Sequence, residues 1–191
     1  MNKPKAKIIE DIARSLINNN KQEAIDWIEQ EYPFKRIKKS RRTYSDEQMC
    51  EVFMRDGFID RYSGDRLVNI GMLKTISVFF SEEFPYQSHW KMTETHPAFW
   101  ELAPTLDHVD PIAMGGLDEP SNWVTTSMMH NMVKSQWTLE QLNWQLHEPG
   151  DLLEWDGLTG YFLKIVVENE ELLEDGLIKK WYLLSKAILN L

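Results

Sequence analysis

The chain has 191 residues, 42% of them hydrophobic, which is enough to build a core of its own. Its one cysteine, Cys50, excludes a disulfide framework and a cysteine-rich zinc site. The net charge of −9 is unevenly distributed along the chain. Residues 1–42 hold 11 Lys or Arg and 6 Asp or Glu, whereas residues 43–191 hold 10 Lys or Arg and 24 Asp or Glu. No apolar run is long enough to span a membrane and no signal-peptide segment opens the chain, so we expect a cytoplasmic protein.

Two helices and a cluster of cations are predicted at the N-terminus. Apolar residues at helical spacing predict an amphipathic helix over about 5–19. A second helix carries apolar residues from Ala24 to Ile28 and stops before Pro33. Six basic residues then form what we call the basic stretch: Lys35, Arg36, Lys38, Lys39, Arg41 and Arg42. The stretch either neutralises the phosphates of DNA or is a solvated linker. Its own residues favour the two interpretations about equally, and the spaced pattern further along the chain, described below, favours contact with DNA phosphates.

Helical and extended segments alternate in the next part of the chain. Ser45, followed by Gln48 three residues later, predicts the capped start of a third helix. Segment 58–67 is interpreted as a strand and a turn. Residues 72–80 are apolar and predict a helix, and residues 97–102 predict one helical turn.

The central stretch, residues 105–135, predicts two strands and a helix. Residues 105–109 form a short run that suits a strand. Prolines and a glycine pair make residues 110–121 a loop. Residues 122–126 carry Trp, Val and two Thr and suit a second strand, and a hydroxyl residue after them caps a helix.

Three helices are predicted after the central stretch, over residues 139–146, 158–167 and 177–191. The chain as a whole predicts an α-rich α+β protein, in which two short antiparallel strands and a helix are surrounded by helices. We divide it into an N-terminal helical segment (1–42), a core region (43–137) and a C-terminal helical extension (138–191).

The central stretch also carries a spaced pattern, D-H-x2-P-x3-G-G-x5-N-x8-N-x2-K. Its members are Asp107, His108, Pro111, Gly115, Gly116, Asn122, Asn131 and Lys134. A single Asp-His pair would be a weak signal, but eight identities in this order and in a strand–loop–strand–helix context are specific. The pattern resembles that of the HNH endonuclease superfamily, whose core is the ββα-metal fold. It covers 31 of the 191 residues.

The residue types of this pattern suit the hydrolysis of a phosphodiester. The imidazole of His108 can accept a proton from water. The Asp107 carboxylate and the Asn131 side-chain carbonyl are hard oxygen donors, which suit Mg²⁺ or another divalent cation such as Mn²⁺. The resemblance implies the same roles, with His108 as the general base and Asp107 and Asn131 as the metal ligands. Since neighbouring residues on a strand point to opposite faces, Asp107 and His108 share one site only if the strand ends or twists there.

The resemblance also assigns supporting roles. Asn122 matches the middle catalytic position, where it braces the loop and helps to orient the histidine. Gly115–Gly116 permit the tight loop. Lys134, one helical turn after Asn131, is expected to contact a DNA phosphate. His130 is a rival ligand beside Asn131, but the x8 spacing from Asn122 favours Asn131.

Two classes of function follow from the sequence. The first is a metal-dependent HNH endonuclease that binds and cuts DNA, without a structural zinc because no thiolate cluster exists to hold one. The second is a catalytically inactive nucleic-acid-binding or assembly protein that keeps the fold, although the loss of a site residue would be its signature and none is lost. RNA as the substrate stays open, because nothing in the pattern discriminates against a 2′-hydroxyl. The sequence predicts neither a target sequence nor an oligomeric state.

Overall fold

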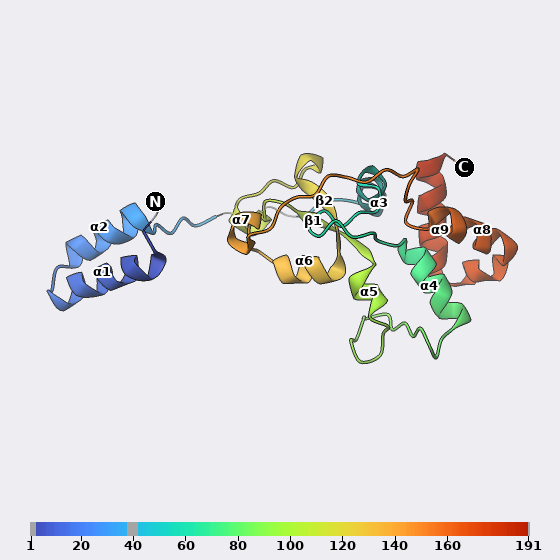
Figure 1. Cartoon of the computed structure of the whole chain (residues 1–191), viewed down its shortest axis with the longest axis horizontal. Coiled ribbons are helices and arrows are strands. Elements are labelled where there is room, and N and C mark those ends of the chain that lie inside the picture. Colours follow the sequence, from blue (N-terminus) through green and yellow to red (C-terminus); the bar gives the residue numbers. More distant parts are fainter. Residues whose placement is uncertain (1–2, 38–41, 191) are drawn as a thin grey trace. The chain divides into compact units, whose positions relative to one another are not determined.

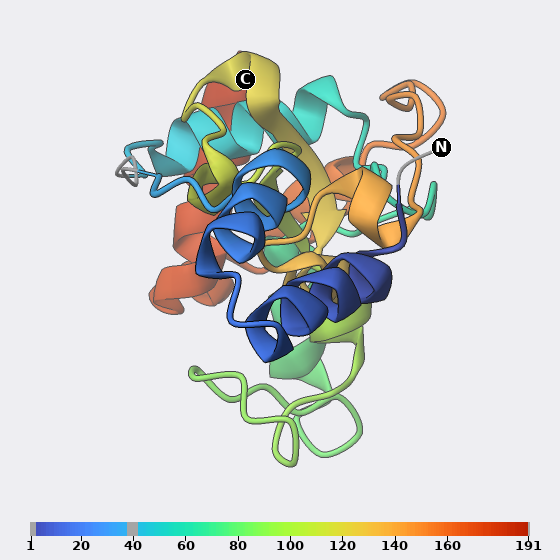
Figure 2. The same ribbon diagram turned by 90° about the vertical axis from the view of Figure 1, so that its left-hand side faces the viewer.

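A computed structural model describes residues 3–37 and 42–190 of the chain (Figures 1 and 2). These residues form two compact units, which divide between Lys38 and Lys39. The boundary that we expected from the sequence, after residue 42, lies a few residues later. Arg42 therefore belongs to the second unit, together with the predicted core region and the C-terminal extension.

The first unit is a helical hairpin. It consists of α1 (Lys5–Ile17) and α2 (Lys21–Glu31), which both views show side by side (Figures 1 and 2). Three asparagine residues connect the helices, and so short a connection makes them antiparallel. Ile8 and Ala24 are buried between them.

The second unit opens with a capped helix, α3 (Asp46–Arg55). The predicted capping box is present, because the Ser45 side chain accepts from the Gln48 amide at 3.2 Å and the Gln48 side chain accepts from the Ser45 amide at 2.8 Å. The helix gives way at Gly57, whose φ of +63° is in the left-handed region. A side chain at Gly57 would also meet the backbone of Gly150, 2.5 Å away, which excludes other residues there.

Two more helices lead to the sheet, α4 (Ile70–Phe79) and α5 (Ala98–Glu101). Both lie where the sequence predicts a helix and a helical turn. The predicted strand over 58–67 is reduced to one isolated bridge between Ile59 and Arg66, since the segment turns back too soon to pair further.

The sheet has two antiparallel strands, β1 (Pro104–His108) and β2 (Trp123–Ser127), paired so that His108 lies opposite Trp123. Helix α6 (Met128–Lys134) follows β2 directly and lies against both strands. This is the order of elements that the central stretch predicts. The loop between the strands contains two 3₁₀ turns, η1 (Ile112–Met114) and η2 (Pro120–Asn122).

The C-terminal part is helical: α7 (Leu139–Leu142), α8 (Thr159–Glu168), η3 (Glu170–Glu174) and α9 (Gly176–Leu189). Helix α7 is shorter than predicted because Asn143 adopts a left-handed backbone with φ of 55°, which ends the helix.

The core of the second unit joins the sheet to the C-terminal helices. Helix α3 contacts both strands and also α9, and α4 contacts α8 and α9. Phe53 of α3 stacks on Trp181 of α9, with ring centroids 6.1 Å apart, and both rings are buried. The architecture is thus the α-rich α+β fold that the sequence predicts (Figure 1). Within the described ranges, no helix is long and apolar enough to cross a membrane.

Candidate functional site

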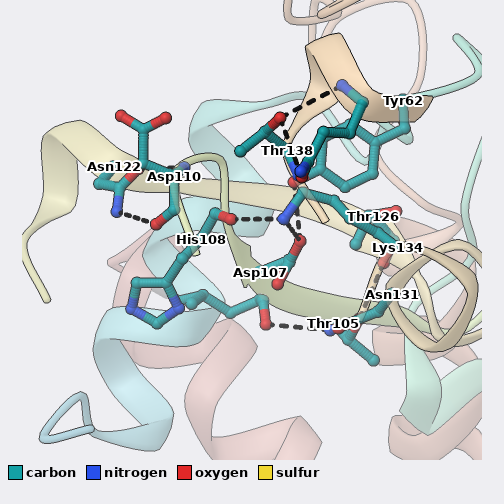
Figure 3. Close-up of polar contacts among 12 residues, drawn as sticks. Tyr62, Thr105, Asp107, His108, Asp110, Asn122, Thr126, Asn131, Lys134 and Thr138 are labelled. Atoms are coloured by element: carbon teal, nitrogen blue, oxygen red, sulfur yellow. Dashed lines mark hydrogen bonds and ion pairs between the residues drawn. The ribbon is translucent and has the colours of Figure 1, made fainter. Parts of the chain in front are cut away.

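The Asp-His pair lies at the end of β1 and lines one cavity. Asp107 and His108 share a cavity of about 200 Å³, and its other walls include Arg42, Ile112 and Gln136. Strand β1 ends at His108, which is the condition for both side chains to reach one site. Figure 3 shows the His108 carbonyl and the Asp107 carboxylate joined to Lys134 of α6, and Asn122 joined to Asp110 in the loop.

The His108 ring is held by a carboxylate from the loop. Its Nε2 lies 2.8 Å from Oδ1 of Asp118, and the indole Nε1 of Trp123 lies 3.0 Å from the same oxygen and 3.1 Å from Nε2. A protonated Nε2 cannot accept the indole proton, so both N–H groups donate to Asp118, the stronger acceptor. This arrangement fixes the tautomer of His108 and leaves the lone pair on Nδ1.

Asp118 is itself held firmly. Its Oδ2 accepts hydrogen bonds from the Thr43 amide at 2.6 Å and from the Thr43 hydroxyl at 3.0 Å. Burial alone would raise the pKa of the Asp118 carboxyl, but the hydrogen bonds from His108, Thr43 and Trp123 outweigh burial and hold the pKa below its usual value of 3.8. The group is therefore a carboxylate at neutral pH, beside the imidazole.

Asp107 has two partners on one oxygen. Its Oδ2 accepts from the Tyr62 hydroxyl at 2.7 Å and lies 2.9 Å from Nζ of Lys134 (Figure 3). Burial and the Asp107 carboxylate raise the pKa of Tyr62, so its hydroxyl stays protonated and donates. Among the described contacts, both partners of Asp107 are on Oδ2 and Oδ1 has no hydrogen-bond partner, while the residue lines the cavity.

The position of Lys134 corrects the expected phosphate contact. The side chain is fully buried, and its Nζ donates to the His108 carbonyl at 2.7 Å in addition to pairing with Asp107. A buried cation needs such partners, because leaving water is costly for a charge. Lys134 thus joins α6 to the end of β1 and is not available to an external phosphate in this structure.

Asn122 braces the loop, as we expected, through its side chain. The amide oxygen accepts from the Asp110 amide at 2.8 Å, and the amide nitrogen donates to the carbonyls of Asp110 and Leu117 at 2.9 and 2.8 Å. Gly116 makes this closure possible, since a Cβ there would lie 1.9 Å from the Asp110 carbonyl oxygen. Gly115 has a left-handed φ of 99°. The His108 ring is oriented by Asp118 rather than by the Asn122 side chain.

Asn131 of α6 contacts β1 at the two residues that precede Asp107. Its Nδ2 donates to the Thr105 hydroxyl at 3.0 Å and to the Leu106 carbonyl at 3.2 Å (Figure 3). The structure thus brings Asp107 and His108 to one cavity and leaves Asn131 outside its lining. Across the described residues, no group of three or more His, Cys, Asp or Glu side chains could hold a metal ion. A cation here would depend on Asp107, on the Asn131 carbonyl and on oxygens from water or substrate.

His130 has a different partner from Asn131. Its Nδ1 lies 2.7 Å from Oδ2 of Asp60, which also accepts from the Ser127 amide at 2.9 Å. Burial would raise the pKa of Asp60, but these hydrogen bonds and the one from the Tyr62 amide outweigh it and hold the pKa below its usual value. The cluster ties the junction of β2 and α6 to the 58–67 segment.

The basic stretch is divided between the two units. Lys35 and Arg36 are exposed in the first unit, and Arg42 is exposed in the second, where it lines the cavity beside Asp107 and His108. The remaining three members, Lys38, Lys39 and Arg41, lie outside the described residues.

Three side chains of the site are outside the sequence pattern and were not predicted from it. Asp118 stands two residues after the glycine pair, and that acid in the loop is the only signal that could have indicated it. Thr43 and Tyr62 come from segments far from the pattern, and only the fold brings them to Asp118 and Asp107.

The cavity thus has a histidine of fixed tautomer, a carboxylate with one open oxygen and an arginine at its wall. Comparisons with known protein families, with curated proteins and with solved structures give no match to this chain.

Proposed function

We propose that the protein is a metal-dependent endonuclease of the HNH type that hydrolyses phosphodiester bonds in DNA. The observation that carries the proposal is that Asp107 and His108 line one cavity while Asp118 holds Nε2 of His108. Both residues belong to the pattern of eight spaced residues that resembles that superfamily.

In this proposal His108 is the general base. With Nε2–H donated to Asp118, the Nδ1 lone pair takes a proton from the attacking water, and the Asp118 carboxylate stabilises the positive charge that the ring then gains. Trp123 and Thr43 restrict movement of Asp118, so the base is oriented before the substrate arrives.

The donor chemistry fits a hard divalent cation such as Mg²⁺ or Mn²⁺. Asp107 lines the cavity, and its Oδ1 has no hydrogen-bond partner among the described contacts, which makes it the first candidate donor. The Asn131 side-chain carbonyl is the second donor that the resemblance implies, although Asn131 lies outside the cavity lining. When bound, such an ion would act as a Lewis acid on the phosphate. Lys134 fixes the other oxygen of Asp107 and so orients the carboxylate.

Arg42 at the cavity wall is the described cation best placed to meet a phosphate. This supports a nucleic-acid substrate despite the net charge of −9. RNA is the second candidate substrate. A catalytically inactive binding or assembly protein is the rival proposal, and the presence of a base, an orienting acid and an open carboxylate oxygen favours the enzyme.

Purified protein with supercoiled plasmid tests the proposal. We expect nicked or linear DNA with Mg²⁺ and none with excess EDTA. His108→Ala should lower the rate by roughly 10²–10⁴-fold, the usual value of a general base. The matched control is His89→Ala, which removes an exposed histidine from a different segment and should cut at the wild-type rate.

Asp107→Ala should raise the Mg²⁺ concentration needed for half-maximal cleavage. Equal rates for His108→Ala and the wild type would contradict the enzyme proposal. DNA binding without cleavage in any divalent metal would favour the inactive binding protein. The same assay with a single-stranded RNA decides between the two substrates.

A further inference from the structure

The hairpin of the first unit exposes a row of large apolar side chains on each helix. On α1 the row contains Ile9 and Leu16, which are 52% and 53% exposed. On α2 it contains Ile25 and Ile28, and it continues to Tyr32 directly after the helix; all three are more than 40% exposed. The spacing i, i+7 on α1 and i, i+3, i+7 on α2 is that of a helix face that is normally buried.

Helix geometry turns both rows to the same side of the hairpin. At about 100° per residue, Ile9 lies about 100° around α1 from Ile8, which is buried against α2. Ile25 lies about 100° around α2 from Ala24, which is buried against α1, in the same rotational sense. Because the helices are antiparallel, equal rotations in the same sense point both rows to one side. The hairpin thus has one continuous apolar face.

So small a unit cannot bury this face by itself. Residues 3–37 form two helices with little between them beyond Ile8 and Ala24. Folded units below about 40 residues usually need a disulfide, a metal or oligomerisation. The hairpin sequence has no cysteine and no histidine, so a disulfide is impossible and a metal lacks its best ligands. Of the three usual ways to stabilise so small a unit, association with another surface is the one that remains.

The charges indicate what covers the face. Residues 3–17 contain four basic and two acidic residues, a balance of +2, and residues 21–31 contain one basic and four acidic residues, a balance of −3. In a pair related by a two-fold axis parallel to the helices, α1 of one copy packs on α2 of its partner, and this contact of opposite charges occurs twice. Residues 43–191 carry a balance of −14, so they would attract α1 but repel α2, whereas a second copy complements both helices. The charges therefore favour a second copy.

We propose that the α1–α2 hairpin is a dimerisation module, in which the apolar faces of two copies meet as a four-helix bundle with α1 packed on α2 of the partner. The packing of antiparallel helices around such a face is the usual solution for helices with an apolar stripe. The proposal does not depend on the nuclease activity, because it rests on the hairpin alone.

The mass of the full chain in solution is the first test. We expect about 45 kDa by light scattering, twice the 22.6 kDa of one chain. Leu16→Glu combined with Ile28→Glu, which places charges on the face, should give about 22.6 kDa. The matched control is Ile17→Glu, because Ile17 is 81% exposed and points about 100° away from Leu16, so this variant should stay dimeric.

Hydrogen exchange gives a second test, which uses only the wild-type protein and so cannot be affected by misfolding of a variant. If the hairpin is ordered by dimerisation, a tenfold rise in protein concentration should slow the exchange of α1 and α2 amides by about threefold, as mass action requires. Amides of α3 and α9 should not respond. Any of three results would overturn the proposal. The first is a monomeric mass at about 100 µM protein, and the second is a dimeric mass for the double variant. The third is an exchange rate of the hairpin amides that does not change with protein concentration.

Discussion

At the scale of single residues, the most informative contact is that between His108 and Asp118. The carboxylate fixes which ring nitrogen carries the proton, so it should matter for rate more than for DNA binding. We expect Asp118→Asn to lower the cleavage rate by roughly 10²-fold or more, by analogy with the acid of a catalytic triad. Asp110→Asn, at an exposed acid of the same loop, is the control. Single-turnover rates and filter binding, measured together, separate the two effects; a loss of binding alone would contradict the orienting role.

The same carboxylate makes stability depend on pH. The pKa of Asp118 in the folded state lies below its usual value of 3.8, so the unfolded chain binds this proton more readily. The contribution of Asp118 to the free energy of unfolding is therefore complete above about pH 4 and is lost as the pH falls through the folded-state pKa. Urea unfolding should show the wild type to be more stable than Asp118→Asn at pH 7, with the difference shrinking below pH 3.8. A difference that stays constant down to pH 2.5 would contradict the assignment.

Lys134 and Asp107 form the buried ion pair of the site. Lys134→Met leaves the Asp107 carboxylate without its cation, and breaking a buried pair in this way costs about 3–5 kcal/mol. Adding Asp107→Asn should recover much of that loss, because no charge then remains buried. Lys164→Met is the control, since Lys164 forms an exposed pair with Glu168 and should change the free energy of unfolding by less than about 1 kcal/mol. Equal urea midpoints for Lys134→Met and Lys164→Met would be the contrary outcome.

At the scale of elements, the sequence predicts most of what local chemistry decides. The helix at Ser45 and the strand–loop–strand–helix order of the central stretch follow from capping, periodicity and turn residues, and the structure has both. The reduction of the predicted strand to an isolated bridge at Ile59 could not be predicted from the local sequence, because strand pairing depends on how far a segment stays extended beside its partner.

The site was predictable only in part, for a physical reason. Asp107 and His108 are neighbours in the chain, so their meeting at one cavity needs only the end of a strand. The burial of Lys134 depends instead on Tyr62 and on the packing of α6 against β1, which the order of residues does not encode locally. From the sequence alone, a lysine one helical turn after Asn131 is predicted to be an exposed cation, because its contact with Asp107 cannot be foreseen.

The loop between the strands permits a prediction about an element. Gly116 lies against the Asp110 carbonyl, so Gly116→Ala must push the loop apart and break the bonds that Asn122 makes across it. We expect slower cleavage and a lower melting temperature. Gly176→Ala introduces the same methyl group where no atom lies within 4 Å and should behave like the wild type. The comparison needs only melting curves and plasmid cleavage; equal behaviour of the two variants would show that the loop tolerates the methyl group.

At the scale of the whole molecule, charge is distributed unevenly. Residues 1–42 carry a balance of +5 and the remainder −14, so any attraction for a polyanion must be concentrated in the first part of the chain. Of the three members of the basic stretch that the structure describes, Arg42 lines the cavity. For the proposed endonuclease, the basic stretch is therefore expected to contact DNA phosphates.

Neutralising the basic stretch tests this view. We expect Lys35→Gln, Arg36→Gln and Arg42→Gln together to weaken binding to all duplex sequences alike, because phosphate contacts carry no base information. Each lost contact should flatten the slope of log affinity against log salt by about 0.9. A matched loss of three positive charges elsewhere, Lys164→Gln, Lys179→Gln and Lys186→Gln, changes the net charge equally and should leave the slope unchanged. If both triple variants shift the affinity by the same amount, only net charge matters and the stretch is a solvated linker. If only the first flattens the slope, the stretch contacts phosphate, and Arg42→Gln alone should then reduce cleavage more than Lys35→Gln, since Arg42 lines the cavity.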